Sequence, residues 1–124
     1  VESTVSEIKN NNFKKVGILS SRSTRDLNLY KDAIEKSEIS TISATDDEQN
    51  ELDNIVLQVM AGKQGTTEKE IMLRIINRMK ALGAEGIVLG CTELPLAINQ
   101  NDSALKLFNT INILANYAVD ESYK

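Results

Sequence analysis

The amino-acid sequence predicts an α/β fold, a doubly wound three-layer domain with a four-stranded parallel sheet flanked by helices. Short apolar runs of strand length alternate along the chain with longer segments whose apolar residues recur at helical spacing. Because each parallel crossover needs a connecting element, this alternation is typical of a parallel sheet covered on both faces. The 124 residues, 41% of them hydrophobic, are enough for one domain with one core.

The chain is expected to begin with a lead-in helix and a first strand. Residues 1–12 place Val5 and Ile8 on one side among polar neighbours, which is typical of a short amphipathic helix. The apolar run at 16–19 has the length of a strand. The serine-rich sequence SSRST at 20–24 then predicts a loop.

A helix and a second strand follow this loop. From Asp26 onward, apolar residues recur at helical spacing. They are Leu27, Tyr30 and Ile34. The β-branched run at 39–43 then predicts the second strand.

The third helix is predicted from its acidic start and its apolar stripe. Asp46 and Asp47 suit a helix N-terminus, and Gly62 suits its end. The expected buried face consists of Leu52, Ile55, Val56, Val59 and Met60.

A further long helix is expected between two glycine-containing turns. Thr66 or Thr67 can cap it, and Glu70 completes the spacing of a capping box with Thr67. Gly83 ends it. Its apolar positions are Ile71, Met72, Ile75, Ile76, Met79 and Leu82.

The last third of the chain supplies the remaining strands and the terminal helix. Residues 86–90 are fully apolar, which predicts a central strand. A short strand is expected at 105–108, and a terminal helix within 109–124. The whole chain, 1–124, is therefore interpreted as a single α/β lobe.

Composition and charge exclude several classes of function. The chain has 14 Lys and Arg against 18 Asp and Glu, a net charge of −4, with neither sign gathered into a block. We therefore expect neither nucleic acid nor a membrane as a partner. The sequence lacks histidine and has no P-loop or dinucleotide-binding motif, so we expect no metal and no cofactor. A single cysteine and the lack of a long apolar run predict a protein of the reducing cytoplasm.

Two loops are expected at the edge of the sheet where ligands bind. In doubly wound sheets, ligands bind outside the carboxyl ends of the strands, at the point where the strand order reverses. The loop at 20–24 follows the first strand, and CTELP at 91–95 follows the third. Both are therefore candidates for a site.

Cys91 allows two interpretations. A lone cysteine in apolar surroundings is usually inert packing. Its position after a buried strand and Gly90, where a ligand can approach the backbone closely, favours a role in a site instead. Backbone amides of the short turn led by Pro95, with Thr92 as its cap, would favour the thiolate. The charge of Glu93 opposes this, so the direction of the pKa shift stays open.

The hydroxyl groups of the first loop are also ambiguous. They belong to Ser20, Ser21, Ser23 and Thr24. Loops are commonly rich in serine and threonine for backbone reasons alone. Their place on the same edge as Cys91 favours an anion-binding role, to which Arg22 and Arg25 would add charge.

The length and strand alternation also fit a response-regulator receiver domain. Such a domain needs acids after its first strand and a phospho-acceptor aspartate after its third. Those places hold Ser20, Ser21 and Cys91. The acidic pair Asp46 and Asp47 is better explained as a helix start.

Three stretches resemble the aspartate/glutamate racemase superfamily. GIVLGCTELPL at 86–96 resembles the family's apolar strand followed by GCTE[LI]PL. VGILSSRSTRDLNLY at 16–30 resembles its strand, small-hydroxyl loop, helix and tyrosine. FNTINILANYAV at 108–119 resembles its closing strand and helix. The chain is thus similar to the C-terminal lobe of an aspartate-racemase-like protein.

The resemblance implies cofactor-independent racemisation by two bases. One cysteine thiolate would remove the α-proton of an amino acid, and a second thiol on the opposite face would return a proton. Cys91 would be one of this pair. The substrate, an amino acid or dicarboxylate, would contact the remaining matched residues, which are Thr92, Glu93, Ser21, Ser23 and Thr24. Glu93 stands where glutamate-racemase-like members have histidine, so the resemblance implies the aspartate-type or broad-specificity branch.

The chain departs from the family pattern in one important respect. It has one cysteine, so the resemblance implies that the second base lies in a missing N-terminal lobe. A start at Val1 rather than Met fits a fragment, and we expect the isolated lobe to be inactive. Asn109 also replaces the aspartate usual before the last helix.

Other functions and a state of association remain open. The alternatives are a non-catalytic carboxylate-binding or amino-acid-binding module and a related maleate isomerase or decarboxylase. Without the other lobe, several apolar residues would lose their cover, so we expect self-association into a homo-oligomer or a mobile C-terminal helix. They are Val5, Ile8, Leu114 and Tyr117.

Overall fold

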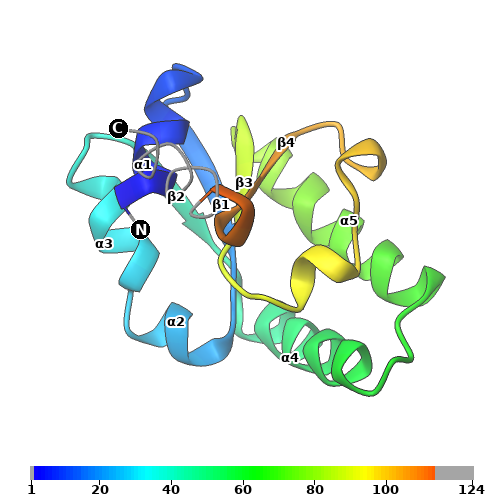
Figure 1. Ribbon diagram of the computed structural model, residues 1–124. Coiled ribbons are helices and arrows are strands. Elements are labelled where there is room, and N and C mark those ends of the chain that lie inside the picture. The colour runs from blue at the N-terminus through cyan, green and yellow to red at the C-terminus, as the bar shows by residue number, and fades with distance from the viewer. Residues whose placement is uncertain (1, 114–124) are drawn as a thin grey trace, which may run out of the picture.

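The computed structural model describes residues 2–113, which form a four-stranded parallel sheet flanked by helices (Figure 1). The strands are β1 (Lys15–Leu19), β2 (Ser40–Ser43), β3 (Gly86–Leu89) and β4 (Lys106–Asn109), in the order β2-β1-β3-β4. The helices are α1 (Glu2–Asn10), α2 (Arg22–Asp26), α3 (Leu29–Glu35), α4 (Asp46–Met60) and α5 (Thr66–Ala81). Two short 3₁₀ turns, η1 (Leu94–Leu96) and η2 (Gln100–Asp102), join β3 to β4. The predicted fold class is confirmed.

Alternate residues of the two central strands enter two separate cores. Val16 and Ile18 of β1 lie with Val88 of β3 in a core that also holds Ile8 of α1 and Ile34 of α3. The opposite core holds residues of both central strands with those of α4 and α5. Its fully buried members include Leu19, Leu52, Ile55, Met72, Ile75, Ile87 and Leu89. Figure 1 shows the corresponding layers, with α1 and α3 on one side and α4 and α5 on the other.

The register of the sheet brings the ends of its central strands level. Leu19 pairs with Leu89, and Leu89 pairs with Asn109. The strand order reverses between β1 and β3, because the chain runs from β1 outward to β2 and then returns to β3. The predicted central place of the third strand is confirmed.

The segment after β1 differs from the prediction of a loop followed by one helix. Residues 22–26 form the short helix α2. Asn28, with φ of 54°, separates this helix from α3. Asparagine adopts the left-handed backbone conformation more readily than most residues do, and this conformation cannot continue a right-handed helix. Leu27 is 67% exposed and Ile34 is buried, so the helical spacing of these apolar residues does not mark one buried face.

The starts of the two long helices show which capping prediction holds. Asp46 begins α4, as predicted, and Thr45 forms a capping box with Glu48. In α5 the cap is Gly65, whose N–H donates to Glu68 Oε1 at 2.7 Å. The predicted box between Thr67 and Glu70 is wrong, because Thr67 already lies within the helix.

Two other expectations about apolar residues also change. Met60, expected on the buried face of α4, is 69% exposed because it lies at the last residue of the helix. Ile8 was expected to lose its cover, but it is fully buried against α3 and the sheet, and Val5 is half-buried. Leu114, Tyr117 and the terminal helix beyond residue 113 lie outside the described residues, whereas 110–113 are helical.

Candidate functional site

The two predicted site loops leave the sheet side by side. The N–H of Gly90 donates to the carbonyl oxygen of Leu19 at 2.8 Å, one residue beyond the paired strands. Ser20 and Ser21 therefore follow β1 at the level where Gly90 and Cys91 follow β3. This is the point where the strand order reverses, the usual ligand position in such sheets.

Gly90 lies in close contact with Tyr30 and Ser20. A Cβ atom placed on Gly90 would be 2.8 Å from Cε2 of Tyr30 and 3.4 Å from Cβ of Ser20. A side chain at this position would displace the tyrosine ring, so the absence of one lets α3 pack against the end of β3. Thr110 supports the same strand end from the other side, by donating to the carbonyl oxygen of Leu89 at 3.0 Å.

Cys91 is half-buried and hydrogen-bonded to the residue two positions further on. Its Sγ atom donates to Oε2 of Glu93 at 2.9 Å. The hydroxyl of Thr92 donates to the same oxygen at 2.7 Å. Thr92 was expected to cap the following turn, but Glu93 is the residue at the cap of η1, and Thr92 bonds to its carboxylate instead.

The surroundings of Cys91 raise the pKa of its thiol. Burial contributes most, and the hydrogen bond to the Glu93 carboxylate acts in the same direction. Backbone N–H groups of Glu93 and Leu94 lower the thiol pKa, as expected for amides at a turn, but they do not outweigh burial. The hydrogen bonds from Cys91 and Thr92 lower the pKa of Glu93. At neutral pH the pair is therefore a thiol and a carboxylate.

The hydroxyl loop divides into residues with different surroundings. Ser21 caps α2: its Oγ accepts from the Thr24 N–H at 3.4 Å and donates to Thr24 Oγ1 at 3.0 Å. Ser23 is exposed on α2. Ser20 is buried, and its hydroxyl donates to the carbonyl oxygen of Ser21 at 3.1 Å. The structure thus pairs Ser21 with Thr24 and leaves Ser23 apart from them.

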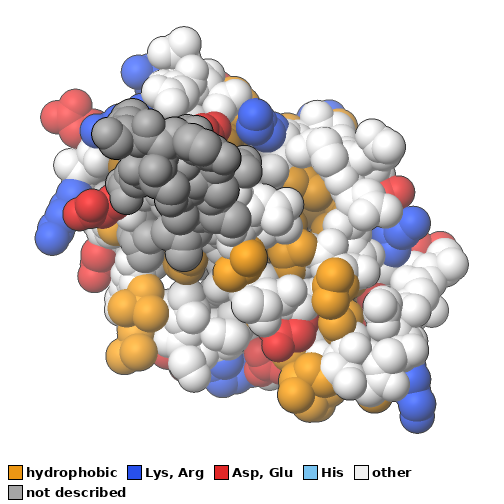
Figure 2. Space-filling view, viewed as in Figure 1, with side chains coloured by type: hydrophobic (Ala, Val, Ile, Leu, Met, Phe, Trp, Pro, Cys, Tyr) orange, Lys and Arg blue, Asp and Glu red, His pale blue; other side chains and the backbone are white. Residues whose placement is uncertain are grey.

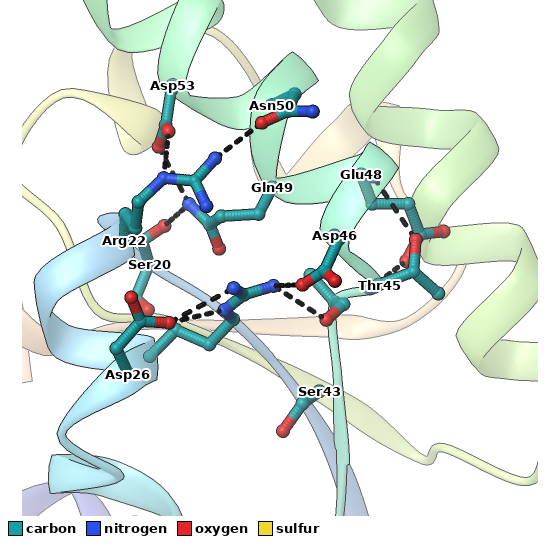
Figure 3. A network of polar contacts seen from close by, with 12 residues as sticks. Ser20, Arg22, Asp26, Ser43, Thr45, Asp46, Glu48, Gln49, Asn50 and Asp53 are labelled. Atoms are coloured by element: carbon teal, nitrogen blue, oxygen red, sulfur yellow. Dashed lines mark hydrogen bonds and ion pairs between the residues drawn. The ribbon is translucent and has the colours of Figure 1, made fainter.

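Carboxylates hold the two arginines of the loop, and Figure 3 labels the aspartates concerned. Arg22 Nε lies 2.8 Å from Asp53 Oδ2. Arg25 forms ion pairs with Asp26 at 3.0 Å and with Asp46 at 3.1 Å. These carboxylates balance the charge that Arg22 and Arg25 were expected to offer an anion.

Gln49 is a functional candidate that the sequence reasoning missed. It is 1% exposed, and its Nε2 donates to the carbonyl oxygen of Ser20 at 3.0 Å and to Asp53 Oδ1 at 2.9 Å. The available signal was its position, since Gln49 lies three residues before Leu52 on the buried stripe of α4. A polar residue at a core position of an amphipathic helix marks a specific buried contact.

Membrane-spanning helices and metal-binding clusters are absent from the described residues. Among residues 2–113, no helix combines the length and apolar character needed to cross a lipid bilayer. The same residues contain no group of three or more Cys, Asp or Glu side chains placed to hold a metal ion.

Comparison with known proteins gives the family. The family model described as Asp/Glu/Hydantoin racemase matches residues 1–118. The chain belongs to this racemase family. A protein of Pectobacterium carotovorum subsp. carotovorum, described as an uncharacterized protein in the pnlA 3′ region, is 28% identical over 102 residues, which are 81% of this chain and 66% of that protein.

Solved structures agree with this racemase-family assignment. A crystal structure from Yersinia pestis, of a protein assigned to the Asp/Glu racemases, has a TM-score of 0.91 at 29% identity and covers 99% of this chain. An aspartate racemase homologue from Pyrococcus horikoshii OT3 has a TM-score of 0.89 at 28% identity, again over 99% of this chain. Aspartate racemase of Picrophilus torridus, at 21% identity and a TM-score of 0.72 over 86% of this chain, shares the fold.

The racemase-family chain corresponds to only part of these proteins. It spans 54% of the Yersinia and Pyrococcus chains and 44% of the Picrophilus chain.

Proposed function

We propose that this chain is the C-terminal lobe of a cofactor-independent racemase of aspartate-type or glutamate-type amino acids, with Cys91 as one of two acid–base residues. The observation that carries the proposal is the position of Cys91. It follows β3 at the strand-order reversal, and its thiol is hydrogen-bonded to Glu93 in a chain of the racemase family. A strand end of this kind exposes a side chain to a ligand without disturbing the sheet.

The protonated state of Cys91 defines its role in the reaction. A base on the opposite face of the substrate takes the Cα proton and leaves an electron pair on Cα. The S–H group of Cys91 then gives its proton to the other face of Cα, which inverts the centre and leaves Cys91 as a thiolate. In the reverse direction this thiolate is the base, and the other group is the acid.

Glu93 supports the donor form of Cys91. Its carboxylate accepts the thiol proton in a hydrogen bond, and its lowered pKa makes it a weak acceptor for full proton transfer. The thiol therefore keeps its proton until a more basic centre, such as the carbanion of the substrate, is close to it. The turn amides of Glu93 and Leu94 then stabilise the thiolate that forms.

Substrate binding is assigned to the hydroxyl groups that flank Cys91. Thr92 is exposed, and Ser21 with Thr24 follows the adjacent strand β1. Hydroxyl groups can donate to a substrate carboxylate while accepting from its ammonium group. Ser23 is exposed on α2 next to Thr24, and we include it in the proposal as a further substrate contact.

The second base is assigned to another lobe. Inversion by two groups needs one on each face of Cα, and this chain has one cysteine. Several large apolar side chains of the described residues are exposed, as Figure 2 shows in part. Those that follow a strand at its carboxyl end include Leu27, Leu29 and Leu96. An apolar surface at this edge suits a covering lobe.

The proposal has consequences for assembly and location. The lobe alone would be inactive, because a single acid–base residue cannot invert the centre. Without its covering lobe it would self-associate through the exposed apolar residues. The whole protein is proposed to be cytoplasmic, since a reducing compartment keeps a working cysteine as a thiol.

The direct test is exchange at Cα by the full-length protein. Incubation with L-aspartate or L-glutamate in D₂O should give deuterium at Cα and the D-enantiomer, detected by NMR and chiral chromatography. Residues 1–124 alone should give neither. A full-length protein that exchanges no dicarboxylic amino acid would contradict the proposed function.

A further inference from the structure

Polar residues of α4 hold the hydroxyl loop at both ends of Ser21. Gln49 binds the carbonyl oxygen of Ser20 through its Nε2 at 3.0 Å. Asp53 binds Arg22 through Oδ2 at 2.8 Å, and Asn50 Oδ1 accepts a further hydrogen bond from Arg22. The residues they hold, Ser20 and Arg22, are the immediate neighbours of Ser21.

Gln49 and Asp53 are also bonded to each other, so the two attachments form one unit. The second hydrogen of the Gln49 amide donates to Asp53 Oδ1 at 2.9 Å, which leaves Oδ2 for Arg22. Both partners of the amide nitrogen are acceptors. A reversed amide would place its oxygen against them, so the hydrogen-bonding pattern determines the orientation of Gln49. Figure 3 shows this connection between Ser20, Gln49 and Asp53.

The orientation of Gln49 has a cost that stability alone does not explain. Its Oε1 atom is buried and is the one buried side-chain polar atom without a hydrogen-bond partner among the described residues. A buried unpaired amide oxygen is unfavourable, and an apolar residue of similar shape would avoid it. The amide lies at a core position where its nitrogen holds the loop that follows β1.

We infer that Gln49 and Asp53 are positioning residues for substrate binding. They hold Ser21 so that its hydroxyl, paired with Thr24, faces the substrate at the end of β1. This inference rests on the proposed function for its effect on turnover, but its effect on the loop can be measured without turnover. Neither residue touches the reacting atoms, so substrate affinity should change more than the chemical step.

Two variants and a matched control test the inference in the full-length protein. Gln49→Met keeps the side-chain volume and removes the amide. Asp53→Asn keeps the shape and replaces an acceptor by a donor that faces either Gln49 or Arg22. Glu48→Gln is the control, because Glu48 lies on the same turn of α4 and is also buried, but bonds to Arg78 and Thr45 instead of the loop.

The first measurement is hydrogen exchange of the amides at 20–25. Both loop variants should speed exchange there by about tenfold relative to the control, because the loop opens locally. The second is turnover of L-aspartate, with succinate as a non-reacting inhibitor. KM and the inhibition constant should rise by about tenfold, with kcat changed less than about twofold.

The outcomes separate positioning from a purely structural role. If Glu48→Gln accelerates loop exchange and raises KM as much as Gln49→Met does, the inference is wrong. It is also wrong if the loop exchanges at the wild-type rate in both loop variants. If the wild-type protein does not exchange Cα hydrogen, the proposed function fails, and faster loop exchange in Gln49→Met and Asp53→Asn alone still supports the positioning of the loop.

Discussion

The Sγ atom of Cys91 donates a hydrogen bond to Oε2 of Glu93 across 2.9 Å. The two groups change each other's acidity in opposite directions. Burial and this carboxylate raise the pKa of the thiol, and the hydrogen bond lowers the pKa of Glu93. At neutral pH the proton of this pair therefore stays on the sulfur of Cys91, at the edge of the sheet where a ligand would bind.

Replacing Glu93 should make the thiol more acidic. Glu93→Gln removes a charge that raises the pKa of Cys91, so the midpoint of the alkylation profile should move to lower pH. The effect of burial stays, so part of the upward shift should remain. The measurement is the rate of iodoacetamide reaction with Cys91 across pH.

Thr92→Val serves as the control for this experiment. It removes a donor to Glu93 but leaves the carboxylate beside the thiol. The midpoint should then stay close to that of the wild type. A Glu93→Gln profile with an unchanged or higher midpoint would show that the carboxylate does not raise the pKa of the thiol.

A methyl group at residue 90 should separate Tyr30 from the end of β3. In Gly90→Ala, the new Cβ would lie 2.8 Å from the tyrosine ring, and overpacking of this kind costs about 1–3 kcal/mol of unfolding free energy. Urea denaturation measures this loss. The double variant Tyr30→Ala/Gly90→Ala should lose less than the sum of the single losses, because the clash is gone. Additive losses would contradict the close contact.

The buried carboxylate at the start of α4 should contribute stability that depends on pH. Burial raises the pKa of Glu48, but hydrogen bonds from Arg78 and Thr45 outweigh it and bring the pKa below its ordinary value of 4.5. A lowered pKa in the folded state contributes stability above pH 4.5 that is lost as the pH falls through the folded-state value. Glu48→Gln should cost about 1–3 kcal/mol at pH 7.

Measurements at acid pH distinguish the contribution of the Glu48 charge to stability from that of its packing. The difference between the wild type and Glu48→Gln should shrink when urea denaturation is repeated at pH 3. Glu51→Gln on the same helix is a matched comparison, because its partner Arg74 is exposed, and it should cost less than about 1 kcal/mol. An equal difference at both pH values would contradict the assignment to Glu48.

The isolated lobe should associate through the sheet edge that carries the proposed site. Leu27 is 67% exposed and follows β1, whereas Leu82 is 52% exposed and precedes β3 at the opposite edge. Light scattering of residues 1–124 should show oligomers that Leu27→Glu weakens and Leu82→Glu leaves unchanged. A monomeric wild-type lobe would contradict this prediction.

Hydrophobic periodicity predicted most of the fold because its signals are local. The apolar runs at 16–19 and 86–90 and the acidic start at Asp46 correspond to β1, β3 and α4. The break at Asn28 was missed, since its cause is a left-handed backbone angle that apolar spacing does not report. The cap at Gly65 was missed because the two threonines that follow it have side chains typical of helix N-caps.

The place of the candidate site residues in the fold was predictable, but the contacts between them were not. The strand ends indicated that Cys91 and Ser21 follow neighbouring strands, and the register places them so. The position of Thr92 before a short turn is compatible with a capping role, and the sequence cannot show that its hydroxyl bonds to the Glu93 carboxylate instead. The contact between Gln49 and Ser20 spans 29 residues and depends on how α4 crosses the sheet, which sequence periodicity does not encode.

The central claim is that Cys91 is one of the two groups that move the Cα proton. The most direct measurement is the rate of racemisation of aspartate and glutamate by full-length Cys91→Ser, followed by chiral chromatography and compared with the wild type after both are shown to be folded. We expect the wild type to exchange the Cα hydrogen and racemise, and the variant to racemise at least about 10²-fold more slowly. Racemisation at the wild-type rate in Cys91→Ser would contradict this claim.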